Sequence, residues 1–240
     1  MNKSMEVYSS VFDNALKISN DIKIEKINDD ITLVDNIFEN YDDLLELVNN
    51  LTFWEGWFFL DSRPVLSHIL PPGFGCELIT KVFDHKFDLY SVDCSVNKNS
   101  SSSTVGTRKL SPSSNAQIPH FDVNENLLQE INADKSIDCS IFLMNFNRFD
   151  VETNFWSYKN KMYVEDASVV EDFRRENGSK ELSERFLNDL SEEYSIKYGP
   201  NQGILYSARM FHSPNLECMS NNEDRICTRV QYFRKLNYGK

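Results

Sequence analysis

The stretch "DRICTRVQYF" (residues 224–233) alternates between two kinds of side chain. Arg225, Cys227 and Arg229 fall on one face of an extended strand, because successive side chains point to opposite faces. The intervening positions, such as Ile226, are largely apolar and suit packing against a helix. A strand with one polar and one apolar face predicts a barrel-like β core with a polar interior and helices outside.

The rest of the chain predicts a mostly β fold with flanking helices. Helical periodicity covers 40–51 and 71–87. Strand patterns cover 30–38, 88–97, 139–146, 153–164, 203–208 and 225–233. No internal repeat or domain boundary interrupts them, so we expect residues 1–240 to form a single domain, with 1–29 as an N-terminal extension.

Two polar segments stand apart from these elements. Residues 97–117, "NKNSSSSTVGTRKLSPSSNAQ", have no periodic apolar positions, which predicts a long flexible loop. Residues 164–195 are polar with helical spacing, broken at Asn177, which predicts a helical insertion. Either segment could act as a lid; loop 97–117 is favoured because it leads directly into the histidine motif described below, and we hypothesise that it orders when substrate binds.

Composition narrows the class of protein. The net charge of −12 and the absence of a basic patch disfavour nucleic acid as a partner. No apolar run approaches the ~20 residues that span a bilayer, and the first residues lack the apolar core of a signal peptide. The five cysteines include no CxxC pair, which favours reduced thiols and a cytoplasmic location.

The stretch "IPHFDVNEN" (118–126) places His120 two positions before Asp122, so both side chains can face one point from a strand. Because 37 of the 240 residues are acidic, such a pair arises easily by chance and is weak evidence alone. His212 follows another predicted strand, 92 residues further on. Two histidines and one carboxylate make up the facial triad of non-haem Fe(II) oxygenases.

The order of short motifs carries a family resemblance. The motifs run "PHFD", "CSIFLMN", "TNFWSY", "GILYSARMFH" and "DRICTRVQYF". Their order and spacing resemble the 2-oxoglutarate/Fe(II)-dependent dioxygenases, in the prolyl-hydroxylase-like branch, over most of residues 30–235. The resemblance implies a double-stranded β-helix (jelly-roll) core with N-terminal helices packed on one sheet.

The resemblance also implies the cofactors and their ligands. His120, Asp122 and His212 match the Fe(II) ligands, with 2-oxoglutarate and O2 as cosubstrates. Arg225, thirteen residues after His212, matches the cation that binds the C5 carboxylate of 2-oxoglutarate. Arg229 lies on the same face and could take that function instead.

Other positions agree with the family less closely. Asn145 and Tyr206 match polar positions near the cosubstrate. Two departures concern the same region: Val151 and Glu152 replace a Gly-Gly pair, and Cys227 stands where many members carry Ser or Thr. They bear on the cosubstrate contacts more than on the metal.

The implied activity is oxidative decarboxylation of 2-oxoglutarate coupled to hydroxylation of a C–H bond in a small molecule, amino acid or peptide. Asp122 favours a hydroxylase, because halogenating members replace this ligand by a small residue. Two alternatives remain. A metal-dependent hydrolase could use the HxD pair, although His68 and His85 lie in the N-terminal half and supply no obvious further ligand. A non-catalytic jelly-roll binding or structural protein would explain the aromatic content.

Overall fold

The computed structural model describes residues 17–50, 54–55, 65–69, 72–83, 87–100, 119–123, 125–134, 137–166, 168–169, 188–215 and 224–235. Its helices are α2 (Tyr41–Asn49), α3 (Pro72–Phe83) and α4 (Glu125–Ala133). Its strands are β1 (Lys23–Lys26), β2 (Thr32–Asp35), β3 (Trp54–Glu55), β4 (Val65–Ile69), β5 (Phe87–Ser100), β6 (Ile137–Asn145), β7 (Val151–Tyr158), β8 (Leu190–Tyr198), β9 (Gly203–Ser207), β10 (Phe211–Asn215) and β11 (Asp224–Lys235). No helix in these ranges is both long and apolar enough to cross a membrane.

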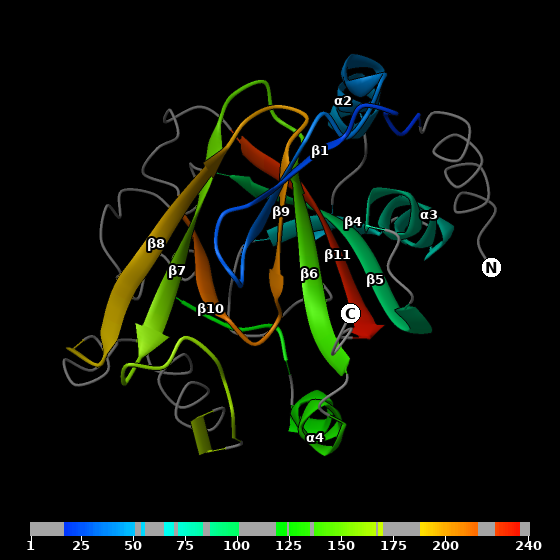
Figure 1. The fold of residues 1–240 in the computed structure, drawn as a ribbon. Helices are drawn as coiled ribbons and strands as arrows, with labels where there is room; N and C mark the ends of the chain where they lie inside the picture. Colours follow the sequence, from blue (N-terminus) through cyan, green and yellow to red (C-terminus); the bar gives the residue numbers. More distant parts are fainter. Residues whose placement is uncertain are drawn as a thin grey trace.

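The strands form two antiparallel sheets (Figure 1). The larger has eight strands in the order β1-β2-β9-β6-β11-β5-β4-β3, and the smaller has three in the order β10-β7-β8. At the centre of the large sheet, β11 pairs with β6 on one side and β5 on the other. The prediction of a mostly β chain with few helices is therefore confirmed.

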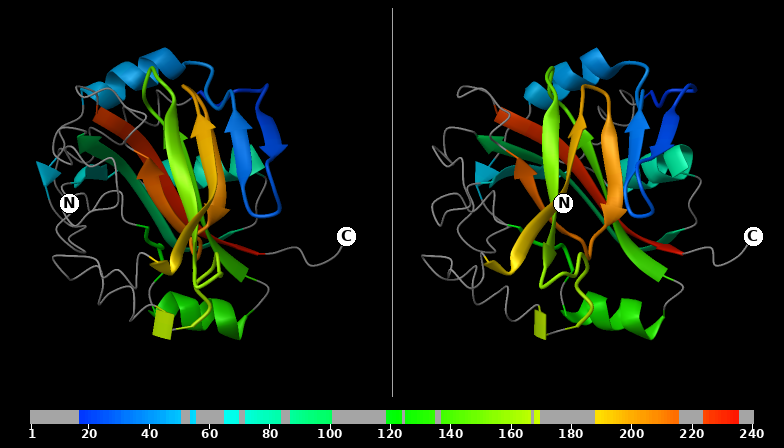
Figure 2. Two further views of the ribbon diagram at one scale, coloured as in Figure 1. Left: turned by 90° about the vertical axis from the view of Figure 1, so that its left-hand side faces the viewer. Right: turned by 60° about the vertical axis from the view of Figure 1, so that its left-hand side comes forward.

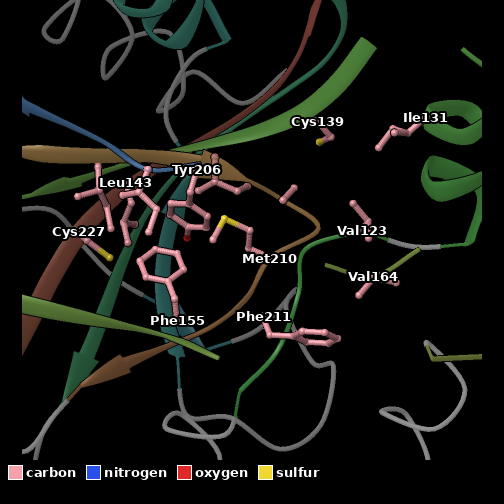
Figure 3. Close-up of a cluster of buried hydrophobic side chains, with 14 of the residues drawn as sticks. Val123, Ile131, Cys139, Leu143, Phe155, Val164, Tyr206, Met210, Phe211 and Cys227 are labelled. Atoms are coloured by element: carbon pink, nitrogen blue, oxygen red, sulfur yellow. The ribbon is translucent and has the colours of Figure 1, made fainter. Parts of the chain in front are cut away.

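One buried cluster fills the space between the two sheets. It joins Ile141 and Tyr206 of the large sheet to Phe155 and Tyr198 of the small one. Figure 3 shows Phe155 and Tyr206 facing each other, and their ring centroids lie 5.1 Å apart. The inner faces of the two sheets thus enclose the interior in which the polar residues of β11 lie.

A second buried cluster covers the opposite face of the large sheet. Leu44, Leu45 and Val48 of α2 recur at helical spacing and are buried there with residues of α3, β6, β9 and β11. The ring of Phe83 in α3 meets Phe142 of β6 edge-on, with centroids 5.0 Å apart. Figures 1 and 2 show α3 on the side of the large sheet that faces away from β7 and β8.

The division of β11 between these clusters follows its sequence. Ile226, Val230 and Tyr232 belong to the outer cluster, whereas Cys227 belongs to the inner one. The alternation read from "DRICTRVQYF" therefore predicted the two faces of this strand correctly.

Gly203 lies at a close approach between two strands of the large sheet. It begins β9 and pairs with Met144 of β6. A Cβ atom at this position would lie 2.9 Å from the backbone oxygen of Leu143 and 2.9 Å from the ring of Phe142. Only glycine therefore fits without displacing the neighbouring strand.

Two predicted boundaries were wrong. Residues 97–100, assigned to the flexible loop, end β5 and pair with both β4 and β11; backbone ladders on both sides hold a strand whose Ser/Asn composition suggested a loop. Residues 190–195, assigned to the helical insertion, belong to β8. Their side chains are polar and exposed, a composition that is also typical of a solvent-exposed helix. Residues 23–26 of the N-terminal extension form β1 and pair with β2. Residues 101–117 and 170–187 lie outside the described residues.

Candidate metal centre

The HxD segment is fixed through its backbone. His120 and His212 exchange two hydrogen bonds: the N–H of His120 donates to the carbonyl of His212 at 2.9 Å, and the reverse bond is 2.8 Å. The N–H of Asp122 donates to the carbonyl of Ala208 at 2.8 Å. Gln231 Nε2 donates to the carbonyl of Asp122 at 3.0 Å. Segments far apart in the sequence therefore hold both predicted ligands of this motif in register.

The three predicted metal ligands converge. One ligand atom from each of His120, Asp122 and His212 lies within 4.8 Å of the other two. Among the described residues, these three side chains are the group that could bind a metal ion. The Nε2 of His212 is 3.3 Å from Oδ2 of Asp122, and the two imidazole centroids are 4.4 Å apart. Phe121, which lies between the two ligands of the HxD segment, packs edge-on against Phe211 instead.

Hydrogen bonding prepares His212 and Asp122 to bind a cation. The Nδ1 of His212 lies 3.0 Å from the carbonyl of Met210, which can only accept, so Nδ1 donates this bond and Nε2 is the ring nitrogen turned toward the other ligands. Burial acts to raise the pKa of Asp122, but Arg229 and the neighbouring histidines together lower it below its ordinary value. The site thus offers an ionised carboxylate beside a correctly oriented imidazole.

Arg225 is a buried cation to which the described residues supply no counter-charge. Its side chain is among the buried polar groups, at 3% residue exposure, and donates to Tyr198 Oη at 2.9 Å and Thr153 Oγ1 at 3.2 Å. Its Nε has no hydrogen-bond partner, and no carboxylate of the described residues pairs with it. Burial raises the pKa of Tyr198 and of Cys227, so both stay neutral. A buried guanidinium in neutral surroundings favours binding of an anion.

Tyr206 contacts the metal ligand His212 and interacts electrostatically with both Asp122 and Arg225. Its ring meets that of His212 edge-on at 4.9 Å, and the charges of Asp122 and Arg225 both act on its hydroxyl. Burial and the Asp122 charge raise the pKa of Tyr206 well above its ordinary value. Tyr206 therefore provides a neutral donor inside the same interior as the triad and Arg225.

Arg229 occupies a different environment from Arg225. Its Nη2 lies 3.1 Å from Oδ1 of Asp122 and donates to Oε1 of Gln231 at 2.5 Å. Of the two arginines predicted for the cosubstrate carboxylate, Arg229 already has a carboxylate partner in the protein.

The amide of Asn145 makes its hydrogen bonds within the protein. It donates to the carbonyls of Phe149 at 2.9 Å and Tyr198 at 3.3 Å, and its oxygen accepts from Asn147. Asn147 in turn bonds both the N–H and the carbonyl of Ile226. Asn145 thus stabilises the turn after β6 and the backbone beside Arg225, and its position near the cosubstrate stays a prediction.

Three residues of this region did not emerge from the sequence: Tyr198, Gln231 and Asn147. Tyr198 ends β8, whose first residues (190–195) were predicted as part of a helical insertion, although "YSIKY" (194–198) alternates as a strand does. Gln231 continues the polar face of "DRICTRVQYF" and could have been found by extending the alternation. Asn147 follows β6 with no local pattern that indicates its contacts.

Comparison with known proteins gives structural likeness only. No protein-family model matches the chain, and no curated protein sequence does. Similar solved structures include HygX from Streptomyces hygroscopicus with nickel and 2-oxoglutarate bound, at 9% identity and TM-score 0.48, covering 99% of this chain and 88% of that one. The non-heme alpha-ketoglutarate-dependent epimerase SnoN from nogalamycin biosynthesis is 9% identical at TM-score 0.43, covering 98% and 86%. EvdO2 from Micromonospora carbonacea var. aurantiaca is 9% identical at TM-score 0.44, covering 89% and 93%. Values this low establish neither family nor activity for this chain.

Proposed function

We propose that this protein is an Fe(II)- and 2-oxoglutarate-dependent oxygenase. The observation that carries the proposal is the convergence of His120, Asp122 and His212 in one interior with Arg225, a buried cation that has no counter-charge in the described part of the chain. A metal triad explains the first feature, and a cosubstrate that bears a second carboxylate explains the other.

The residues present fit a ferrous ion. Two imidazoles and one ionised carboxylate are the donor set that non-haem Fe(II) takes. The bond from His212 Nδ1 to a backbone carbonyl is the support that metal-binding imidazoles normally have. Bound iron would supply the activation of O2 that is coupled to decarboxylation of 2-oxoglutarate.

The chain itself would bind and orient the cosubstrate. The guanidinium of Arg225 would bind the C5 carboxylate, and Tyr198 and Thr153 hold that guanidinium in place. The Tyr206 hydroxyl would donate a hydrogen bond to the same molecule. Phe155, which packs against the rings of both Tyr206 and His212, would exclude water from this interior.

Several finer features belong to the same proposal. The two sheets would correspond to a double-stranded β-helix of the prolyl-hydroxylase-like branch, and the reaction would be hydroxylation of a small molecule, amino acid or peptide. Asp122 supports hydroxylation because it occupies the position at which halogenating enzymes lack a carboxylate.

The test is anaerobic titration of the protein with Fe(II) and then 2-oxoglutarate. A weak visible charge-transfer band should develop with wild type and be absent from Asp122→Ala and His212→Ala, with circular dichroism unchanged. Succinate formation under air should follow the same pattern. A metal-dependent hydrolase would bind the ion without a 2-oxoglutarate band, and a non-catalytic module would bind neither; either result in wild type would contradict the proposal.

A further inference from the structure

We propose that Arg229 is a positioning residue that restricts Asp122 to one metal-binding oxygen, so that the ion keeps an open coordination position. The inference rests on the proposed function, because it concerns the same metal centre. It assigns Arg229 a task different from that of Arg225.

The two carboxylate oxygens of Asp122 face different partners. Oδ2 lies 3.3 Å from Nε2 of His212, on the side of the other metal ligands. Oδ1 lies 3.1 Å from Nη2 of Arg229. The side chains of Asp122 and Arg229 are only 14% and 17% exposed, so water competes little for this contact. Oδ2 is therefore the oxygen available to a metal, and Oδ1 is engaged by the guanidinium.

A closed ring of hydrogen bonds keeps Arg229 in this position. Its Nη2 also donates to Oε1 of Gln231 at 2.5 Å. The amide of Gln231 then donates to the backbone carbonyl of Asp122 at 3.0 Å. Gln231 thus joins the guanidinium to the main chain of the residue whose side chain the guanidinium binds, and the carboxylate cannot rotate without breaking the ring.

Such a restraint matters because a carboxylate binds a metal ion through one oxygen or through both. Binding through both would consume a position that a facial triad otherwise leaves open for the cosubstrates. A charge-assisted bond to Oδ1 opposes that second metal–oxygen bond. Without Arg229, the freed Oδ1 would be expected to join the metal.

The number of water molecules bound to Mn(II), measured by water-proton relaxation, tests this directly and needs no turnover. Wild type should retain about three exchangeable waters on a six-coordinate ion, and Arg229→Met about two. Arg229→Lys keeps a cation in reach of Oδ1 and should give the wild-type number. Arg225→Met is the matched control, because it removes a buried guanidinium that does not touch Asp122, and its water number should equal that of wild type.

An unchanged water number in Arg229→Met would overturn the inference. If that variant does not fold, Gln231→Leu removes the side chain that links Arg229 to the backbone of Asp122, and its mean number of Mn(II)-bound waters should lie below that of wild type. An unchanged water number in Gln231→Leu would equally overturn the inference. Failure of the proposed function looks different, because wild type would then either bind no Mn(II) or bind a metal ion without developing the 2-oxoglutarate charge-transfer band.

Discussion

Replacing Arg225 by Met should separate stability from cosubstrate binding. The substitution removes a buried cation whose partners are both neutral hydroxyls. Those hydroxyls, on Thr153 and Tyr198, lie 3.2 Å apart and can still bond each other. Exchanging a buried charge for an apolar side chain of similar length is often neutral or stabilising by on the order of 1–4 kcal/mol. The protein without 2-oxoglutarate should therefore melt no lower than wild type.

Binding of 2-oxoglutarate should weaken strongly in the same variant. Truncating one partner of a buried, hydrogen-bonded charge pair costs about 2–5 kcal/mol. At about 3 kcal/mol, the dissociation constant rises on the order of 100-fold, because 1.4 kcal/mol corresponds to one factor of ten. The arginine would thus cost stability in the free protein and contribute it only when the dicarboxylate is bound.

Thermal denaturation with Mn(II) and 2-oxoglutarate measures both effects. At a ligand concentration of about 100 times the wild-type dissociation constant, wild type gains about 2.7 kcal/mol and the variant about 0.4 kcal/mol. For a chain of this length these gains correspond to rises in melting temperature of roughly 5–11 °C and roughly 1–2 °C.

The matched control is Arg148→Met, whose side chain is 76% exposed and lies 3.8 Å from Asp42. It should keep the full ligand-induced rise. The reasoning is refuted if Arg225→Met keeps that rise, or if it melts far below wild type without ligand, since the guanidinium would then be a structural group of the core.

Three further predictions concern the surrounding fold. Asn147→Ala removes a buried amide that bonds both the N–H and the carbonyl of Ile226, so the melting temperature should fall by roughly 5–10 °C. The exposed Asn20→Ala should cause almost no change, and equal effects of the two substitutions would contradict the importance of the turn after β6. Gly203→Ala forces a Cβ against a backbone oxygen of β6 and should cost about 1–3 kcal/mol in urea denaturation. Gly199→Ala meets only the side-chain ends of Asp150 and Gln202, which can turn away, and similar losses in both variants would refute the packing argument. Burial raises the pKa of Cys139 to about 12, so roughly one thiol in 10,000 is ionised at pH 8. Mass mapping after iodoacetamide treatment should therefore find Cys139 unlabelled until urea is added. Labelling of the folded protein as fast as that of the unfolded protein would show that the thiol is accessible.

Much of the metal centre was predictable because its signals are local. His120 and Asp122 lie two apart on an extended segment, and strand geometry alone places both side chains on one side. The alternation of β11 likewise separates Arg225 from Ile226 without knowledge of the partners. Convergence of His212 on the pair is a tertiary fact, which the sequence only made plausible.

What the sequence missed depends on pairing between distant strands. Polar composition suggested loop or helix for residues 97–100 and 190–195, but backbone bonds to neighbouring strands form regardless of side-chain polarity. The different functions of Arg225 and Arg229 were also beyond the sequence. Both lie on one face of β11, and only the position of Asp122 in space decides which guanidinium meets it.

The paired backbone bonds between His120 and His212 have a consequence for the order of folding. They close a loop of 92 residues, whose entropic cost is about 4 kcal/mol plus a constant. Contacts of such long range form late, so the transition state would contain little of the metal centre. A bound ion should then slow unfolding while leaving the rate of refolding almost unchanged. The metal would act on the lifetime of the folded chain and not on the speed with which it forms.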